Sequence, residues 1–453
     1  MKNRNKPRLQ DPIERGKNFN EVSLGFDEET AILEANRCIQ CKKPFCMEGC
    51  PVSVNIPGFI LQLRTKNFDE ASKILKETNM LPAVCGRVCP QETQCESKCI
   101  LGRKGESVAI GSLERFIGDY AIKNAKPKEI KNVAKGKVAI VGSGPAGLTC
   151  AADCRANGLD VTIFESLHEP GGVLTYGIPE FRLPINIVKS EIQSLKEIGV
   201  DIELNVVIGK TIFIEELLEE YDAIFLGSGA GLPIFLEMEG ENLPGVYSAN
   251  EYLTRVNLMG AYKKDSATPL VKGKVVAVVG AGNVAMDSAR TALRLGAEKV
   301  MIVYRRSRKE MPARHEEIEH AEEEGIEFIL LTNPVKILGK SHVEGMEVVK
   351  MDLGEEDEKG RRRPIPIEGS NYFIECDQVI MALGASPNPL IVNSCPELKT
   401  GRNGVLIVDE NLETSIKNVF AGGDATSGSA TVIQAMGAGR RAAKSIVERL
   451  KSK

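Results

Sequence analysis

Several kinds of residue and segment are scarce or missing in this chain of 453 residues, and each absence excludes a class of protein. Tryptophan is absent and aromatic residues make up only 5%, so the sequence offers no stacking platform for nucleic-acid bases. The formal net charge of −4 gives no attraction to nucleic acid or to an anionic membrane surface. No apolar run reaches the roughly 18 residues of a membrane-spanning helix. The polar N-terminus, MKNRNKPRLQDPIERG, has no apolar stretch typical of a secretory signal.

Cysteine, by contrast, is abundant, with twelve in the chain. Because no export signal is present, we expect a cytoplasmic protein whose thiols serve metal or redox chemistry and not disulfides. Two runs stand out, each with a Cys-Pro step, and they comprise Cys38, Cys41, Cys46, Cys50, Cys85, Cys89, Cys95 and Cys99. The first run spaces as C-x2-C-x4-C-x3-C-P, close to the bacterial ferredoxin run. Thiolates suit zinc as well as iron–sulfur clusters, so zinc stays the alternative on spacing alone.

The cysteine runs lie in a region, residues 1–132, whose pattern differs from the rest of the chain. Apolar residues recur at helical spacing in residues 56–79, and SLERFIGDYAIKNA gives a second helical pattern after the last cysteine of the runs. We therefore predict a mostly α-helical domain whose core depends on its metal. A Lys- and Pro-containing linker at 126–137 leads into the strand-like KVAIV.

A glycine-rich turn follows that strand and opens a β-α-β unit that ends at Glu165. The first glycine permits a tight turn, the second lets backbone approach a pyrophosphate, and the third packs helix against strand. A carboxylate at the end of the second strand can accept hydrogen bonds from ribose hydroxyls. The candidate ligands of this first nucleotide are Gly142, Ser143, Gly144, Pro145, Ala146, Gly147 and Glu165.

A second, related turn follows KVVAVV and again opens a β-α-β unit. Its candidate residues are Gly280, Ala281, Gly282, Asn283 and Val284. Arg305 and Arg306, instead of an acid, stand at the end of the second strand, and guanidinium groups bind a 2′-phosphate that an acid would repel. This predicts NADP, with a solvated basic turn as the alternative.

Two nucleotide sites in one chain are most simply explained by a flavin and a nicotinamide. Near the C-terminus, VFAGGD predicts a strand followed by Gly423 and Asp424, and a helix that begins near Thr431. Asp424 could hold a ribityl hydroxyl, and the helix N-terminus could stabilise a reduced flavin. We thus predict an α/β fold with two Rossmann-like domains, the NADP domain (233–386) inserted into an FAD domain (133–232 plus 387–453).

Together these strings resemble the glutamate synthase small-subunit family. That family includes the N-terminal half of dihydropyrimidine dehydrogenase, the large subunit of NADH-dependent ferredoxin:NADP oxidoreductase and the sulfide dehydrogenase alpha subunit. The motifs that carry the resemblance are CIQCKKPFCMEGCP, GRVCP, GSGPAGL, PGGVLTYGIPEFRLP, GAGNVAMD with YRRS, and AGGD. The resemblance implies FAD, NADP(H) and two [4Fe-4S] clusters as cofactors.

The family pattern also implies particular ligands. Cys38, Cys41, Cys46 and Cys99 would hold one cluster, and Cys50, Cys89, Cys95 and Glu114 the other, which leaves Cys85 as a spare. Gly171, Gly172 and Arg182 would lie near FAD. Ala382, Leu383 and Gly384 would lie near the nicotinamide.

The predicted function is an electron relay in which nicotinamide exchanges hydride with flavin and the flavin exchanges single electrons with the clusters. The hydride step needs no protein acid or base, so we name no catalytic residue. The expected partner is a redox subunit: a small flavoprotein, as in the bifurcating ferredoxin:NADP transhydrogenase, or the large subunit of glutamate synthase. Ferredoxin is a further partner, and nucleic acid and membrane are not expected. A zinc-stabilised flavoprotein that only binds partners is the alternative from another class.

Overall fold

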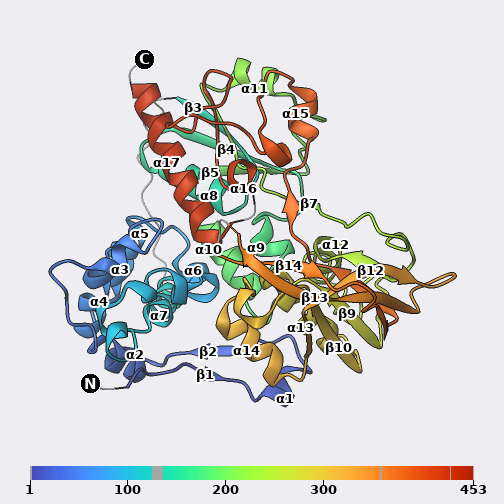
Figure 1. Ribbon diagram of the computed structural model, residues 1–453. Helices are drawn as coiled ribbons and strands as arrows, with labels where there is room; N and C mark the ends of the chain where they lie inside the picture. Colours follow the sequence, from blue (N-terminus) through green and yellow to red (C-terminus); the bar gives the residue numbers. More distant parts are fainter. Residues whose placement is uncertain (1–2, 125–135, 358–359, 429, 452–453) are drawn as a thin grey trace.

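A computed structural model describes residues 3–124, 136–357, 360–428 and 430–451, and its N-terminal part is mostly helical (Figure 1). Residues 126–135 of the predicted linker at 126–137, and with them the predicted boundary at 132, lie outside the described residues. The N-terminal part also contains one short antiparallel pair of strands, β1 and β2. The elements are β1 (Arg8–Leu9), α1 (Pro12–Arg15), β2 (Ser23–Gly25), α2 (Glu28–Ala35), α3 (Phe45–Glu48), α4 (Ile56–Arg64), α5 (Phe68–Lys76), α6 (Pro82–Val88) and α7 (Ile110–Lys123).

The helical pattern predicted for residues 56–79 folds as two helices, α4 and α5. Asn55 begins α4 by accepting a hydrogen bond from the backbone N–H of Gly58. The break comes where Lys66 takes a positive φ of 61°, which ends the first helix and turns the chain. On α4, Leu61 is exposed while Ile60 and Leu63 enter the core, as expected for a helix with one buried face.

The first α/β unit contains a five-stranded parallel sheet in the order β18-β6-β3-β4-β5. Its strands are β3 (Lys137–Val141), β4 (Asp160–Glu165), β5 (Val200–Leu204), β6 (Ala223–Leu226) and β18 (Val419–Ala421). The central strands are almost continuously apolar and buried because helices cover both faces. The helices include α8 (Pro145–Ala156), α9 (Val173–Tyr176), α10 (Ile185–Glu197), α11 (Ile214–Glu220), α15 (Leu390–Ser394), α16 (Asp424–Ser427) and α17 (Val432–Lys451).

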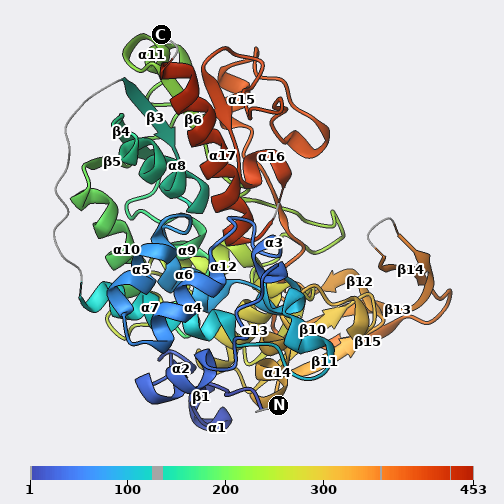
Figure 2. The same cartoon turned by 90° about the vertical axis from the view of Figure 1, so that its left-hand side faces the viewer.

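The second unit also contains a five-stranded parallel sheet, in the order β11-β10-β9-β16-β8, and carries an antiparallel extension. The parallel strands are β8 (Val246–Ser248), β9 (Val275–Val279), β10 (Lys299–Tyr304), β11 (Glu327–Leu330) and β16 (Gln378–Met381), with helices α12 (Ala249–Val256), α13 (Asn283–Arg294) and α14 (His315–Glu323). The extension comprises β12 (Thr332–Leu338), β13 (Gly345–Glu356), β14 (Arg362–Pro366) and β15 (Tyr372–Glu375). Strands β13 and β14 pair antiparallel and project from the body in Figure 2.

The second unit lies in the chain between strands β6 and β18 of the first sheet. The two crossings pair with each other as the antiparallel strands β7 (Leu232–Pro233) and β17 (Ala385–Ser386). These crossings support the predicted insertion, and the domain limits at 232 and 386 stay our proposal.

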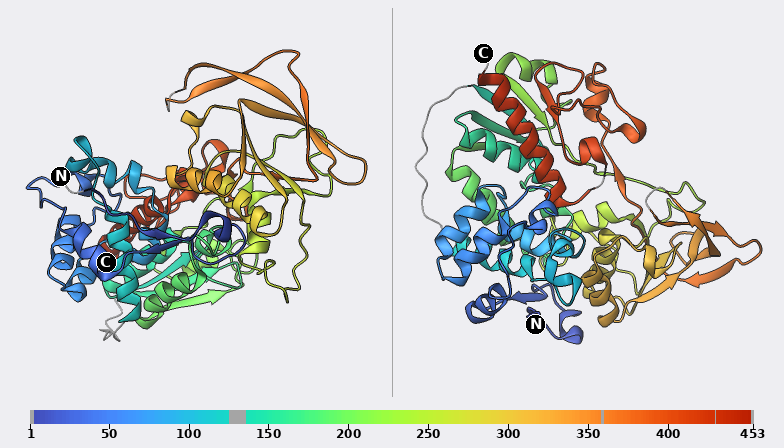
Figure 3. Two further views of the ribbon diagram at one scale, coloured as in Figure 1. Left: turned by 90° about the horizontal axis from the view of Figure 1, so that it is seen from below. Right: turned by 60° about the vertical axis from the view of Figure 1, so that its left-hand side comes forward.

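Figures 1 and 3 show α17 running from the C-terminus towards the helical N-terminal part. At its lower end Gly437 faces Pro51: a Cβ on Gly437 would lie 3.0 Å from the Pro51 carbonyl oxygen. The first sheet's C-terminal helix therefore contacts the loop that carries the first cysteine run. Within the described residues no helix has both the length and the apolar character needed to cross a membrane.

Candidate functional site

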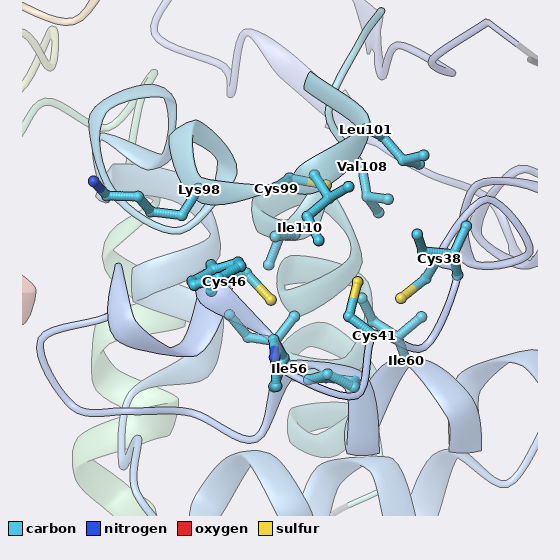
Figure 4. Close-up of a pocket in the computed structure, with 15 residues that line it drawn as sticks. Cys38, Cys41, Cys46, Ile56, Ile60, Lys98, Cys99, Leu101, Val108 and Ile110 are labelled. Carbon is cyan, nitrogen blue, oxygen red and sulfur yellow. The ribbon is translucent and has the colours of Figure 1, made fainter. Parts of the chain in front are cut away.

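Four cysteines from three segments line one pocket, shown in Figure 4: Cys38, Cys41, Cys46 and Cys99. Cys38 follows the end of α2, Cys46 lies in the one-turn helix α3, and Cys99 comes from the later cysteine run. Burial, and after it the neighbouring thiols, raise the pKa of Cys46 to about 12. Four thiolates would repel one another in such a site, so a bound cation centre is needed to hold them in ionised form. This is the set that the family pattern assigns to the first cluster.

A second pocket is lined by Cys50, Cys89, Cys95 and Glu114. Burial raises the pKa of Glu114 to about 7, and a hydrogen bond from Asn79 partly opposes that rise. Cys85, the predicted spare, does not line this pocket and is fully buried beside it. The structure thus brings together the predicted second ligand set and leaves Cys85 outside it.

The spacing of the sulfur atoms bears on the choice between zinc and a cluster. Within the described residues, one group of three or more His, Cys, Asp or Glu side chains places its ligand atoms within 4.8 Å of one another, and it is Glu215, Cys395 and Glu397. A tetrahedral zinc ion with Zn–S bonds of about 2.3 Å would need sulfurs roughly 4 Å apart. Within the described residues, neither cysteine pocket holds three ligand atoms that close together.

The first glycine turn has the geometry of a pyrophosphate cradle. Gly142 has a φ of +94°, and a Cβ on Gly147 would lie 1.9 Å from the Gly142 carbonyl oxygen, so both positions require glycine. Gly144, at the N-terminus of α8, faces open space: a Cβ there would meet nothing within 4 Å. A phosphate can therefore approach the backbone at Gly144, with free N–H groups of the helix end pointing towards it.

Three other predicted residues pack against this turn. Glu165 is buried and accepts hydrogen bonds from the backbone N–H and the hydroxyl of Ser143, at 2.9 and 2.5 Å. The Ser143 hydroxyl in turn accepts from the N–H of Gly171 at 2.9 Å. A Cβ on Gly172 would lie 2.8 Å from the Cα of Gly144. The PGG string therefore forms one wall of the first nucleotide site.

The C-terminal segment closes the same site from the other side. Gly423, with a φ of +70°, lies against the turn: a Cβ there would come within 2.9 Å of the Ala146 side chain. Asp424 accepts a hydrogen bond from the N–H of Ala430 at 3.2 Å, and burial raises its pKa to about 6. Thr431 caps α17 by accepting from the N–H of Gln434 at 3.3 Å.

The first turn of α17 also touches the second cysteine pocket. Ile433 lines that pocket, and the side-chain amide of Gln94, another lining residue, donates to the Thr431 hydroxyl at 3.5 Å. The helix end that was expected beside the flavin is therefore also a wall of the second cluster site.

The second glycine turn repeats the first. Gly280 has a φ of +127°, and a Cβ there would lie 2.3 Å from the carbonyl oxygen of Ala382. Gly282 faces open space, with the nearest atom to a Cβ at 3.9 Å, and Gly384 likewise meets nothing within 4 Å. The structure thus brings the predicted Ala382, Leu383 and Gly384 segment to the edge of this turn. Val284 is exposed on the first turn of α13.

The two arginines predicted for the 2′-phosphate have different surroundings. Arg305 is exposed, whereas Arg306 is buried and donates to the backbone carbonyl of Arg362 at 2.7 Å. The pKa of Arg305 is lowered by burial and by the positive charges of Arg306 and Arg361. Asp357 lies 3.5 Å from Arg306 and 3.7 Å from Arg361, so those two arginines share a carboxylate, and Arg305 is the exposed arginine of the three.

Arg182 was predicted to lie near FAD, and the structure gives it a different set of contacts. Its Nη1 donates to both carboxylate oxygens of Asp287 in α13, at 2.8 and 2.7 Å. Its Nε lies 3.1 Å from a carboxylate oxygen of Glu317 in α14. These contacts tie the first unit to the second, and contact with FAD stays a proposal.

Several contacts around the sites involve residues that no motif identifies, such as Arg314, Gln91 and Asn79. Asn283 accepts from the backbone N–H of Arg314 at 3.0 Å, and the Arg314 guanidinium donates to Gln91, a wall of the second cysteine pocket, at 3.2 Å. Asn79 holds Glu114. These contacts join segments far apart in the chain, so no local spacing predicts them.

Taken together, the fold and the sites define an oxidoreductase with two dinucleotide-binding units behind a cysteine-rich helical part. Residues 15–126 match the family of dihydropyrimidine dehydrogenase domain II with its 4Fe-4S cluster, and residues 136–439 match the pyridine nucleotide-disulphide oxidoreductases. The chain belongs to the glutamate synthase small-subunit family and is an NADPH-dependent flavin and iron–sulfur oxidoreductase. The predicted fold class and the kinds of cofactor are confirmed at this level, and the number of clusters stays a prediction.

Several relatives support this assignment. The chain is 38% identical to the glutamate synthase [NADPH] small chain of Halomonas elongata, over 96% of this chain and 94% of that one. It is 38% identical to the beta subunit of the NADP(+)-dependent formate dehydrogenase of Moorella thermoacetica, over 90% of this chain but only 61% of that one. FprA from Mycobacterium tuberculosis in complex with NADPH superposes with a TM-score of 0.60 at 20% identity, covering 70% of this chain and 85% of that one, which supports the fold alone.

Proposed function

We propose that this chain relays electrons between NADP(H), FAD, two [4Fe-4S] clusters and a partner redox subunit. The observation that carries the proposal is the order of the sites. Ile433, next to the Thr431 cap at the flavin side, lines the second cysteine pocket, and that pocket shares Ile56 and Ile110 with the first. The sites therefore form a continuous series that starts at the first nucleotide turn.

The series ends near the surface. The cysteines of the first pocket are half-buried, whereas Cys89 and Cys95 of the second are buried. Ile39, on the wall of the first pocket, is 57% exposed. A cluster there is the one that a partner can approach, so we place electron exchange with the partner at the first pocket.

The geometry supports the following assignment of residues to each group. The two cysteine pockets would hold the clusters, the turn around Gly144 would hold FAD with Asp424 opposite, and the turn around Gly282 would hold NADP(H) with Arg305 on its 2′-phosphate. When bound, the flavin converts two-electron hydride chemistry into one-electron transfer. The protein's own contribution is alignment of the groups and exclusion of water around the buried second pocket.

The charges at the rim of the first pocket indicate the kind of partner surface. Lys42, Lys43 and Lys98 are exposed there, and Arg103 lies over the ring of the lining residue Phe45 at 5.8 Å. Exposed Glu48 offsets part of this positive charge. A basic rim around an electron exit favours a partner with an acidic docking face, such as an acidic iron–sulfur protein of the ferredoxin kind.

For the whole enzyme we propose the bifurcating ferredoxin:NADP transhydrogenase type, with a small flavoprotein subunit as partner. The string LPAVCGRVCPQETQCESKC, with its Cys85, supports this type. The small subunit of glutamate synthase is the second candidate. The 38% identity to the glutamate synthase [NADPH] small chain of Halomonas elongata over 96% of this chain supports this second candidate.

Purified protein tests the relay. It should be brown, contain about eight irons and one FAD per chain, and oxidise NADPH with a dye acceptor. Colourless protein that contains zinc would contradict the proposal.

Purification of the native complex tests the partner. A small flavoprotein, with NADPH-dependent reduction of ferredoxin that requires NAD, would support the transhydrogenase type. Co-purification of a large amidotransferase subunit, with glutamate formed from glutamine and 2-oxoglutarate, would replace it by the second candidate.

A further inference from the structure

A buried asparagine, Asn79, contacts Glu114, the carboxylate that lines the second cysteine pocket. Its side-chain amide donates to Oε1 of Glu114 at 2.6 Å. Its carbonyl oxygen, Oδ1, accepts from the backbone N–H of Leu81 at 2.9 Å. A backbone N–H can only donate, so the oxygen of the amide must face Leu81 and its NH2 group must face Glu114. The direction of the Asn79–Glu114 hydrogen bond is therefore fixed by the backbone.

The spare cysteine lies on the other side of the same asparagine. Cys85 is fully buried, and its Sγ lies 3.6 Å from Oδ1 of Asn79. It also lies 3.5 Å from Sδ of Met436 in α17. Cys85 is thus placed to donate to the amide oxygen and to pack against the helix that begins at the first nucleotide site.

We propose that Asn79 is a positioning residue for the second cluster, and that Cys85 supports Asn79 instead of binding iron. This inference rests on the proposed function. With Oε1 engaged by the amide, Oε2 of Glu114 is the oxygen that would bind iron. A ligand that is also hydrogen-bonded has a fixed orientation, and such outer contacts tune a metal site as well as hold it.

The sign of the tuning follows from the charge. The amide donor withdraws negative charge from the carboxylate, which favours the reduced, more negative cluster. Loss of the donor should therefore make the second cluster harder to reduce and leave the first cluster unchanged. A role in folding alone would not produce a shift confined to one cluster.

The test is a redox titration of the full-length protein, followed by EPR, with iron and FAD counted on the same samples. Asn79→Ala should keep the iron content of the wild type. It should lower the equilibrium constant for one-electron reduction of one cluster by about tenfold, which is a fall of about 59 mV in its reduction potential. Asn79→Asp keeps the oxygen that faces Leu81 but replaces the donor by a second acceptor. It should shift the same cluster further, or release that cluster alone. Asn67→Ala, at the exposed start of α5, is the matched control and should change neither cluster.

Substitutions at Cys85 test whether its thiol supports Asn79, and they leave Asn79 itself unsubstituted. Cys85→Ala should shift the same cluster in the same direction by less than Asn79→Ala, and Cys85→Ser, whose hydroxyl can still donate, should restore the wild-type potential. Normal iron with unchanged potentials in Asn79→Ala would overturn the proposal. Loss of one cluster in Cys85→Ser with both retained in Glu114→Ala would also overturn it, because Cys85 would then be the ligand. Absence of iron from the wild type would instead contradict the proposed function.

Discussion

At the residue scale, two glycines of the first turn are glycine for different reasons. A Cβ on Gly147 would lie 1.9 Å from the Gly142 carbonyl oxygen, whereas a Cβ on Gly144 would meet nothing within 4 Å of the protein. Gly147→Ala should therefore prevent the helix from packing on the turn, while Gly144→Ala should fold normally and place a methyl group where the pyrophosphate is expected.

We expect Gly144→Ala to purify as folded protein with wild-type iron content and FAD reduced by tenfold or more. Circular dichroism, iron analysis and flavin absorbance measure the three properties. Gly428→Ala is no suitable control because its φ is +72°. Gly401→Ala is the matched control, because Gly401 has a φ of −95° and a Cβ there would meet its nearest atom at 3.6 Å. Full FAD content in Gly144→Ala would remove this turn from the flavin site.

Arg305 and Arg306 are adjacent, but the structure separates their roles. Arg305→Ala should weaken NADPH binding by about 10- to 100-fold, as expected for the loss of a charge-assisted contact of about 1.4–2.8 kcal/mol. NADH binding should stay unchanged, because NADH has no 2′-phosphate. Arg306→Ala should in addition lower stability, because the Arg362 carbonyl loses its donor.

Equilibrium titration of both nucleotides against each variant measures these affinities. Arg308→Ala is the matched control, since Arg308 lies on the same segment but is exposed and paired with Glu322. Equal loss of NADPH and NADH affinity in Arg305→Ala would contradict the assignment of the 2′-phosphate.

At the element scale, a carboxylate from α10 accepts a hydrogen bond from the first turn of the cysteine-bearing helix α6. Oε1 of Glu191 accepts from the backbone N–H of Ala83 at 2.9 Å. Within the described residues its buried Oε2 has no hydrogen-bond partner. Burial raises the pKa of Glu191 to about 7; Lys76 and Arg87 oppose the rise, and Asp119 adds to it. The contact between the two elements therefore depends on a carboxyl group that ionises near neutral pH.

The sign of the pH dependence follows from the raised pKa. The folded state binds the proton more tightly than the unfolded state, so this contribution to stability is fully present below about pH 4.5 and is lost as pH rises through about 7.

Glu191→Gln keeps the acceptor for Ala83 and cannot ionise. It should be more stable than the wild type at pH 8, by about 1 kcal/mol, with a flatter profile between about pH 4.5 and 8 because the wild type loses stability between about pH 4.5 and 7. Melting temperatures across that range test this, with the exposed Glu197→Gln of α10 as control. Parallel profiles for wild type and Glu191→Gln would show that Glu191 does not titrate there.

The elements that the sequence predicts well are those with local patterns. The two β-α-β units and the helix after Thr431 form where a strand, a glycine turn and helical periodicity follow one another. Of the antiparallel extension, the charged run at 355–364 predicts only the hairpin loop between β13 and β14, and no comparable local pattern predicts β12 or β15. The two cysteine pockets could be assigned only through the family pattern, because Cys99 joins the first pocket from more than fifty residues along the chain. The contacts of Asn79 and Arg182 depend on elements 35 and 105 residues away, which no spacing rule reaches.

At the scale of the whole molecule, buried ion pairs join all three parts of the chain. Arg15 of the N-terminal part pairs with Glu324, which also pairs with Arg290 and Arg294 of α13. Arg182 of the first unit completes the set through Asp287 and Glu317. The network holds the second unit against the other two, so it sets how the nucleotide turns face each other.

Removing one member of this network should be costly because its partners stay buried. Burial raises the pKa of Asp287 to about 6, although Arg182 lies beside it. Burial also acts to raise the pKa of Glu317, but the positive charges of Arg182 and Arg290 lower it below its ordinary value. Arg182→Ala would leave both carboxylates short of positive charge and should destabilise the protein by about 3–5 kcal/mol. Asp287→Asn should be destabilising as well.

The double variant Arg182→Ala/Asp287→Asn should cost less than the sum of the two single variants, because the two side chains are coupled. Urea unfolding of the cofactor-loaded protein measures the three values. Lys66→Ala, which removes an exposed pair with Glu28, is the control and should cost less than about 1 kcal/mol. Additive losses for Arg182 and Asp287 would show that their contact contributes nothing to the joint between the units. A coupled loss would establish that this arginine holds the nicotinamide unit in place, whether or not it also touches the flavin.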